Sequence, residues 1–156
     1  MNTKLSILGA LGWVVLTLLA AFIGARFPIG EWYAGLTKPS WNPPNWLFGP
    51  VWTVLYLLMA LAAWLVWRKY SFSGASGALA LFIFQLGLNA AWSWIFFGLH
   101  QIGLALFEIL VLWAAISLTI IKFWQLNPLA GVLLLPYLAW VTFASVLNLA
   151  IWRLNH

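Results

Sequence analysis

The sequence predicts an all-α integral membrane protein, built as a five-transmembrane-helix bundle with a structured loop between helices 1 and 2. Of its 156 residues, 65% are hydrophobic and 6% are charged, and the mean hydropathy is +1.02, whereas soluble domains carry about 25% charged residues. Long charge-free segments separate the few ionisable residues, and a helix that crosses a membrane needs roughly 20 apolar residues. We therefore expect one transmembrane domain over residues 1–156.

The expected spans follow from the apolar runs and from the residues that interrupt them. Proline restricts the residue before it, so Pro28 ends the first run and the Asn127–Pro128 step ends the fourth. Pro50 places the start of the second helix close by, because proline is tolerated in a first helical turn. Small residues over 71–77 indicate a turn. We expect helices over residues 5–25, 47–67, 77–98, 102–123 and 129–152.

The first apolar run also has the charge pattern of a secretory signal peptide, since Lys4 precedes it. The charge-free stretch from Leu5 to Ala25 is, however, longer than a signal-peptide core of about 7 to 15 residues. This length favours a retained transmembrane helix over a cleaved leader.

The connection over residues 26–46 is long for a loop between two membrane helices. It is rich in tryptophan and proline, and this composition continues to Tyr56. Residues 31–36 are expected to form a short interfacial turn, and the proline steps at Pro39 and Pro43 favour extended backbone after it. Because long connections of this kind are usually functional when they are ordered, we interpret residues 26–46 as a lid.

Composition excludes several classes of function. The net charge of +5 comes from scattered basic residues, without the clustered stripe that nucleic-acid binding needs. There is no cysteine, and His100 and His156 are isolated, so we expect neither a disulfide nor a metal site. Glu31 belongs to the lid and Glu108 to a span, which argues against a glycosidase-like acid/base pair. The sequence therefore predicts no ordinary catalytic residues.

Polar residues inside the spans concentrate in the half of the membrane beneath the lid. Hydrocarbon offers no hydrogen-bonding partner, so these side chains should face the bundle interior. For Gln85 we favour hydrogen bonding between helices, and for Asn89 the lining of a cavity. Glu108 either forms a hydrogen bond between helices or lines a cavity, and both roles stay open. The residues at this depth are Trp52, Tyr56, Gln85, Asn89, Trp92, Ser93, Glu108, Trp140, Ala144 and Asn148.

The 13 tryptophans fall into two groups. Those near span ends are typical of the aromatic belt at the headgroup level. Trp52, Trp92 and Trp140 instead share the inner faces with the buried amides, and the small Ala144 one turn beyond Trp140 leaves space beside it. Apolar cavities with flat aromatic walls bind flat aromatic ligands. We therefore predict an aromatic pocket closed by the lid.

The motifs resemble those of the translocator protein family, also called the peripheral benzodiazepine receptor or tryptophan-rich sensory protein family. The resemblance covers essentially the whole chain. It is carried by Trp32-Tyr33, Leu36, Lys38-Pro39, Trp41, Pro43-Pro44, Phe48, Pro50-Val51-Trp52, Leu55-Tyr56, Gln85-Leu86, Leu88-Asn89, Trp92, Ile95-Phe96-Phe97-Gly98, Pro136-Tyr137-Leu138-Ala139-Trp140, Leu147-Asn148 and Trp152-Arg153.

The resemblance implies a multi-pass membrane receptor or sensor, usually a homodimer, with a role in porphyrin transport or regulation. Its ligands would be porphyrins such as protoporphyrin IX or haem, and isoquinoline or benzodiazepine-type compounds. The alternatives are a light-dependent porphyrin-degrading enzyme, in which Trp52 and Trp140 would act, and a membrane interaction scaffold. The implied ligand-binding residues are Tyr33, Pro43, Trp52, Asn89, Trp92, Trp140, Ala144 and Leu147.

Two departures from the animal members stand out. The segment over residues 147–153 lacks the tyrosine of their cholesterol motif, a motif that is weak even when complete. Asn42 and Asn45 occupy lid positions where those members tend to have histidines. The two asparagines are expected to change ligand preference, and the short end at His156 is expected of a bacterial member in a bacterial membrane.

Overall fold

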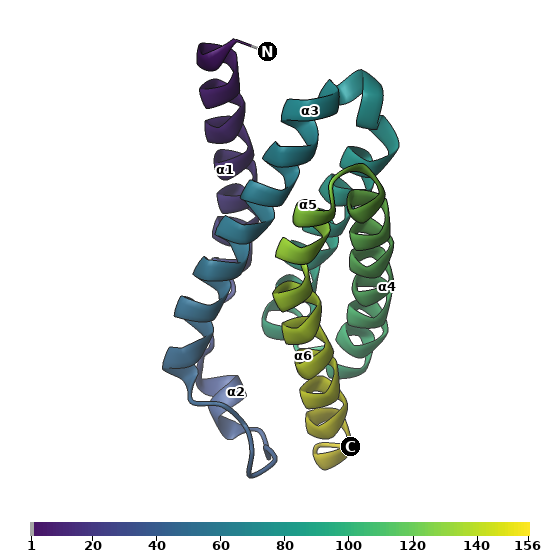
Figure 1. Ribbon diagram of the computed structural model, residues 1–156. Helices are drawn as coiled ribbons and strands as arrows, with labels where there is room; N and C mark the ends of the chain where they lie inside the picture. Colours follow the sequence, from purple (N-terminus) through teal and green to yellow (C-terminus); the bar gives the residue numbers. More distant parts are fainter. Residues whose placement is uncertain (1) are drawn as a thin grey trace.

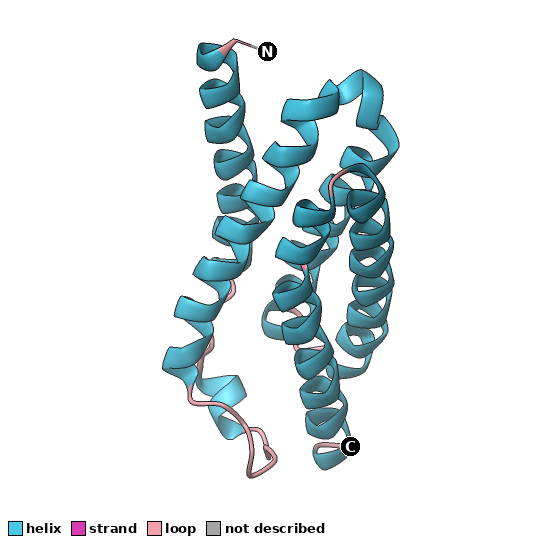
Figure 2. Ribbon diagram, in the orientation of Figure 1, coloured by secondary structure: helices cyan, strands magenta, loops and turns pink. Residues whose placement is uncertain are grey.

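The computed structural model describes residues 2–156, and within that range the chain is helical with short connections and no strand (Figure 2). Helix α1 covers Thr3–Ala25, and α2 is a short helix over Glu31–Gly35 in the first loop. Helix α3 covers Asn45–Ser93 and continues into the π-helical turn η1, Trp94–Gly98. The remaining helices are α4 (Ile102–Leu126), α5 (Pro128–Leu133) and α6 (Leu135–Leu154).

Helix α3 crosses the membrane twice. Four helical stretches are long and apolar enough to span a bilayer, and one of them, Asn45–Gly98, has 54 residues. Its backbone leaves helical geometry at Ser71 (φ 56°, ψ −176°) and Ala75 (φ −134°, ψ 25°). The two halves, here the first arm (residues 45–70) and the second arm (residues 76–98), fold back at this point (Figure 1). With this reversal the chain has five crossings, and the predicted fold class is confirmed.

Several helix ends differ from the expected bounds. The last span is divided at Leu134 into α5 and α6, because Pro136 has no N–H to bond the carbonyl of Val132 and its ring crowds the preceding turn. The first arm begins at Asn45, so Pro50 lies in the second turn of its helix. Helix α4 continues to Leu126 and stops where Asn127 takes an extended conformation before Pro128.

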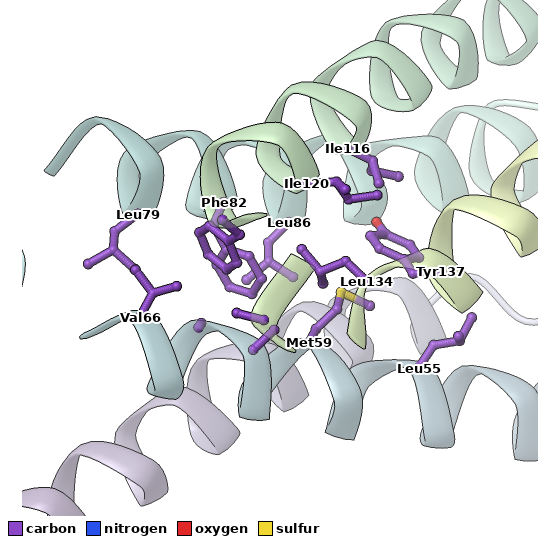
Figure 3. Close-up of a cluster of buried hydrophobic side chains, with 14 of the residues drawn as sticks. Leu55, Met59, Val66, Leu79, Phe82, Leu86, Ile116, Ile120, Leu134 and Tyr137 are labelled. Atoms are coloured by element: carbon purple, nitrogen blue, oxygen red, sulfur yellow. The ribbon is translucent and has the colours of Figure 1, made fainter. Parts of the chain in front are cut away.

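The apolar core lies between the two arms of α3, helix α4 and the α5–α6 junction. Figure 3 shows Met59 and Leu55 of the first arm near Leu134 and Tyr137, with Phe82 of the second arm in the same cluster. Phe82 stacks on Phe123 of α4 with the ring centroids 5.6 Å apart. Helix α1 packs beside the first arm (Figure 1) and leaves most of its apolar residues exposed to lipid.

The first loop is ordered by its own contacts. The Lys38 Nζ donates to the carbonyl oxygens of Tyr33, Ala34 and Leu36 at 2.7, 3.2 and 2.8 Å, which satisfies the free carbonyls at the end of α2. Trp32 stacks on His100, with centroids 4.1 Å apart and an interplanar angle of 12°. The loop, the η1–α4 connection and the C-terminus therefore meet at one end of the bundle (Figure 1).

Candidate functional site

A cavity of about 370 Å³ lies between α1, the two arms of α3 and helix α6. This volume is within the range of ligand pockets, roughly 300 to 1,000 Å³. None of its lining side chains is charged, so the enclosed part of a ligand would be uncharged. The lining residues are Leu18, Ala21, Gly24, Ala25, Phe27, Pro28, Ile29, Phe48, Gly49, Trp52, Thr53, Tyr56, Asn89, Trp92, Ser93, Phe97, Trp140 and Ala144.

The sequence-predicted site residues are distributed over this cavity and its surroundings. Five of them line it: Trp52, Asn89, Trp92, Trp140 and Ala144. Tyr33 and Leu147 line a neighbouring cavity of about 30 Å³, which shares Trp92 and Ala144 with the larger one. Pro43 is buried in the lid and is not among the lining residues of either cavity.

Three tryptophans form the aromatic walls. Trp52 meets the ring of Tyr137 edge to face at 6.2 Å, Trp140 meets Phe48 in the same way at 5.9 Å, and Trp92 stacks on Phe96 at 5.1 Å. Such contacts fix the planes of the indole rings. A flat ligand would therefore meet preformed walls.

The indole N–H groups differ in their availability. The Trp92 Nε1 donates to the Asn148 Oδ1 at 3.1 Å. Within residues 2–156, Trp52 and Trp140 donate no hydrogen bond through their indole nitrogens. Indole N–H groups are donors only, so these two can each serve an acceptor atom on a ligand.

Asn148, Gln85 and Glu108 lie outside the lining of the larger cavity, and Asn148 lines the smaller one. Asn148 accepts from Trp92 and donates to the carbonyl of Ile102 at 3.0 Å, so it joins three helices. Gln85 is 1% exposed and accepts a hydrogen bond from Tyr137 at 2.7 Å. Glu108 is buried, and neither of its carboxyl oxygens has a hydrogen-bond partner among the described residues. The cavity wall role considered for Glu108 is thus not seen.

The lid contributes to the site through its first residues. Phe27, Pro28 and Ile29 line the cavity, whereas Tyr33 reaches the smaller cavity from α2. The Tyr33 hydroxyl donates to the Asn42 Oδ1 at 2.9 Å, and the Lys38 Nζ lies 4.8 Å from the centre of its ring. Burial raises the pKa of the Tyr33 phenol, and the hydrogen bond with Asn42 partly offsets this rise.

Sequence reasoning missed two sets of residues. The cavity face of α1, Leu18, Ala21, Gly24 and Ala25, lies in a uniform apolar run that carries no marker of a binding surface. Tyr137 was also missed, although a phenol at the depth of Gln85 and Asn89 is a natural partner for their amides. That shared depth is the signal that identifies it.

The arrangement is suited to binding more than to acid/base chemistry. Among the described residues no group of three or more His, Cys, Asp or Glu side chains comes together. The polar side chains at the cavity are indoles, a phenol, an amide and the hydroxyl groups of Thr53 and Ser93. Such groups orient a ligand through hydrogen bonds and stacking.

Comparison with known proteins gives a consistent result. The model of the TspO/MBR family matches residues 13–153. The chain is 45% identical to the translocator protein of Homo sapiens, over 94% of this chain and 90% of the human protein. It is 42% identical to the tryptophan-rich protein TspO of Archaeoglobus fulgidus, over 97% and 99% of the two chains. It is also 44% identical to the tryptophan-rich sensory protein of Cereibacter sphaeroides, over 86% and 84%.

Proposed function

This chain belongs to the TspO/MBR family, and we propose that it is a membrane receptor for porphyrins and related flat apolar ligands. The ligand would occupy the cavity beneath the first loop, with Trp52, Asn89, Trp92, Trp140 and Ala144 around it. In this proposal the protein senses or transports the bound porphyrin. The proposal extends to Tyr33, Pro43 and Leu147 as residues that support the site from the lid and from α6.

One observation carries this proposal: three indoles and the side-chain amide of Asn89 border a single uncharged cavity. Burying a flat conjugated ring there removes a large apolar area from water, at about 25 cal/mol per Å². Each offset-stacked or edge-to-face pair adds about 0.5 to 1.5 kcal/mol. Ionised side chains of the ligand would stay outside, near the membrane surface.

The test is a titration of protoporphyrin IX into the protein in detergent, followed by quenching of tryptophan fluorescence. Trp140→Ala removes a cavity wall, and we expect roughly a tenfold weaker affinity, which corresponds to about 1.4 kcal/mol. Trp124→Ala is the control, because Trp124 is exposed on α4 and lines neither cavity, so its removal should leave the affinity unchanged. Equal affinities in the wild type and Trp140→Ala would reject the site.

A second candidate function is light-dependent breakdown of the bound porphyrin. It is favoured by the position of Trp52 and Trp140, which both line the cavity. An indole next to a photoexcited porphyrin can give it an electron, with molecular oxygen as the final acceptor. The test compares loss of porphyrin absorbance under illumination in the wild type and in Trp52→Phe/Trp140→Phe. Equal rates in the two proteins would exclude a role for these indoles.

We also propose that the chain forms homodimers through the second arm of α3. Gly87 is exposed there, a Cβ added to it would meet nothing within 4 Å, and Ala91 follows one turn later. Small residues at this spacing allow two helices to approach closely in a membrane. Gly87→Leu should convert dimers to monomers, as measured by the mass of the protein in detergent. Dimers of unchanged stability would place the interface elsewhere.

A further inference from the structure

A chain of hydrogen bonds runs from the core to the cavity wall through five buried side chains. The Gln85 Nε2 donates to the Met59 Sδ at 3.9 Å, and the Gln85 Oε1 accepts from the Tyr137 hydroxyl at 2.7 Å. The Tyr137 oxygen accepts from the Asn89 Nδ2 at 2.9 Å. The Asn89 Oδ1 accepts from the Tyr56 hydroxyl. All five side chains are 6% exposed or less.

The sulfur atom at the inner end gives this chain a direction. A thioether accepts hydrogen bonds and has nothing to donate, so Gln85 must turn its NH₂ group toward Met59. Its carbonyl oxygen then faces Tyr137, which gives up its single hydroxyl hydrogen. In the reverse orientation the Gln85 oxygen would face the sulfur, and two acceptors would lie against each other in the core.

The orientation of the Asn89 amide at the cavity is set in the same way. Because the Tyr137 hydrogen is used on Gln85, its oxygen can only accept, and Asn89 must present an N–H to it. The Asn89 carbonyl is thereby turned to Tyr56, whose only hydroxyl hydrogen it receives. Each orientation is set by the one before it.

The cavity wall is therefore left with a defined pair of groups. Tyr56 and Asn89 both line the cavity. The Tyr56 oxygen has given away its hydrogen and can only accept, while Asn89 keeps one N–H that has no partner within residues 2–156. One acceptor and one donor thus lie on neighbouring side chains.

We propose that Met59, Gln85 and Tyr137 are positioning residues that set this hydrogen-bond polarity, and that the cavity selects flat ligands carrying a cis-amide edge. In such a lactam the ring N–H donates to the Tyr56 oxygen, and the adjacent carbonyl accepts from the Asn89 N–H. Linear tetrapyrroles with terminal lactam rings belong to this class. The proposal rests on the cavity being the binding site proposed above.

The test uses a matched pair of bicyclic probes in competition with protoporphyrin IX. Isoquinolin-1(2H)-one has the N–H next to the carbonyl, and its N-methyl derivative has the same shape without the donor. We expect the wild type to prefer the first by about tenfold, because a site that loses a hydrogen bond to a buried group rejects the analogue. The quantity that matters is the ratio of the two affinities.

Two variants change the polarity of the hydrogen-bond chain at residues that do not line the cavity. Met59→Leu removes the acceptor at nearly constant volume, and Tyr137→Phe interrupts the chain; both should bring the ratio close to one. Leu79→Met is the control, since Leu79 is equally buried in the same cluster and should keep the wild-type ratio. If Tyr137→Phe does not fold, the affinity ratio measured in Met59→Leu still tests whether the hydrogen-bond polarity sets the lactam preference.

The outcomes separate this inference from the proposed function. If protoporphyrin IX does not bind the wild type, the porphyrin site itself is wrong, and this inference fails with it. If the porphyrin binds and both probes displace it equally well, only the lactam preference is overturned. A tenfold preference that survives in Met59→Leu and Tyr137→Phe would overturn the positioning role of these residues.

Discussion

The side-chain amide of Asn155, at the C-terminal end of α6, pairs with both backbone groups of Thr37 in the lid. The Thr37 N–H donates to the Asn155 Oδ1 at 2.9 Å, and the Asn155 Nδ2 donates to the Thr37 carbonyl at 2.8 Å. The same Nδ2 also donates to the carbonyl of Ile151 at 2.7 Å, which fixes the side chain on its helix. The first loop is thus fastened to the last helix.

This pairing predicts that Asn155→Ala loosens the lid. Two hydrogen bonds at an exposed position contribute about 1 kcal/mol together, so we expect bound protoporphyrin IX to dissociate roughly fivefold faster. Stopped-flow measurement of the dissociation rate tests this. Asn45→Ala is the control, because Asn45 is exposed at the start of α3 and makes no side-chain hydrogen bond among the described residues. An unchanged rate in Asn155→Ala would show that the lid does not gate release.

Tyr33 predicts how the lid responds to alkaline pH. Burial raises its pKa above the ordinary value of 10.0, so the docked lid keeps the phenol proton at a pH where the undocked lid loses it. Docking is therefore fully favourable below about pH 10 and weakens as the pH rises further. We expect protoporphyrin affinity in the wild type to fall above that pH. The fall should be shallower in Tyr33→Phe, which lacks the titrating group; parallel curves would contradict the assignment.

The contact between α1 and the first arm predicts a sharp difference between two glycines. A Cβ atom added to Gly9 would lie 1.9 Å from the ring of Trp67, whereas one added to Gly12 would meet nothing within 4 Å. Gly9→Ala should therefore lower the free energy of unfolding by about 1 to 3 kcal/mol. Gly12→Ala should be neutral or slightly stabilising. Thermal unfolding in detergent distinguishes them, and equal melting temperatures would contradict the close packing of α1.

The five-span fold class could be predicted because charge and proline mark the ends of the apolar runs. Hydropathy alone could not show that α3 reverses through a left-handed Ser71, since the turn depends on backbone geometry. The three cavity tryptophans were found because their depth could be counted from the span ends. The α1 face was not found, because leucine and alanine against a cavity look the same in sequence as leucine and alanine against lipid.

The partners of hydrogen bonds between helices also could not be predicted from the sequence. That Gln85 and Asn89 need partners follows from the lack of water in the membrane. Which partners they take depends on the rotation of α6, which brings Tyr137 between the two amides. No single-residue pattern specifies that rotation. Lid contacts such as Asn155 with Thr37 join residues 118 positions apart, and they too arise only from the assembled bundle.

The buried carboxyl group of Glu108 predicts that an apolar replacement stabilises the protein. Its side chain is 8% exposed, and neither carboxyl oxygen has a partner within residues 2–156. A buried polar group without a hydrogen bond costs about 1 to 3 kcal/mol, and an ionised one costs more. Glu108→Met replaces the carboxyl group with an apolar side chain of similar length, so it should raise the free energy of unfolding by about 1 kcal/mol or more.

The same variant should leave porphyrin affinity unchanged, because Glu108 does not line the cavity. Glu31→Met is the matched control: Glu31 is exposed at the start of α2, and its replacement should change stability little. Unfolding by heat in detergent, together with the porphyrin titration, gives both readouts. A less stable Glu108→Met protein would mean that the carboxyl group has a bound partner in the membrane, such as an ordered water molecule, whose hydrogen bonds the substitution removes.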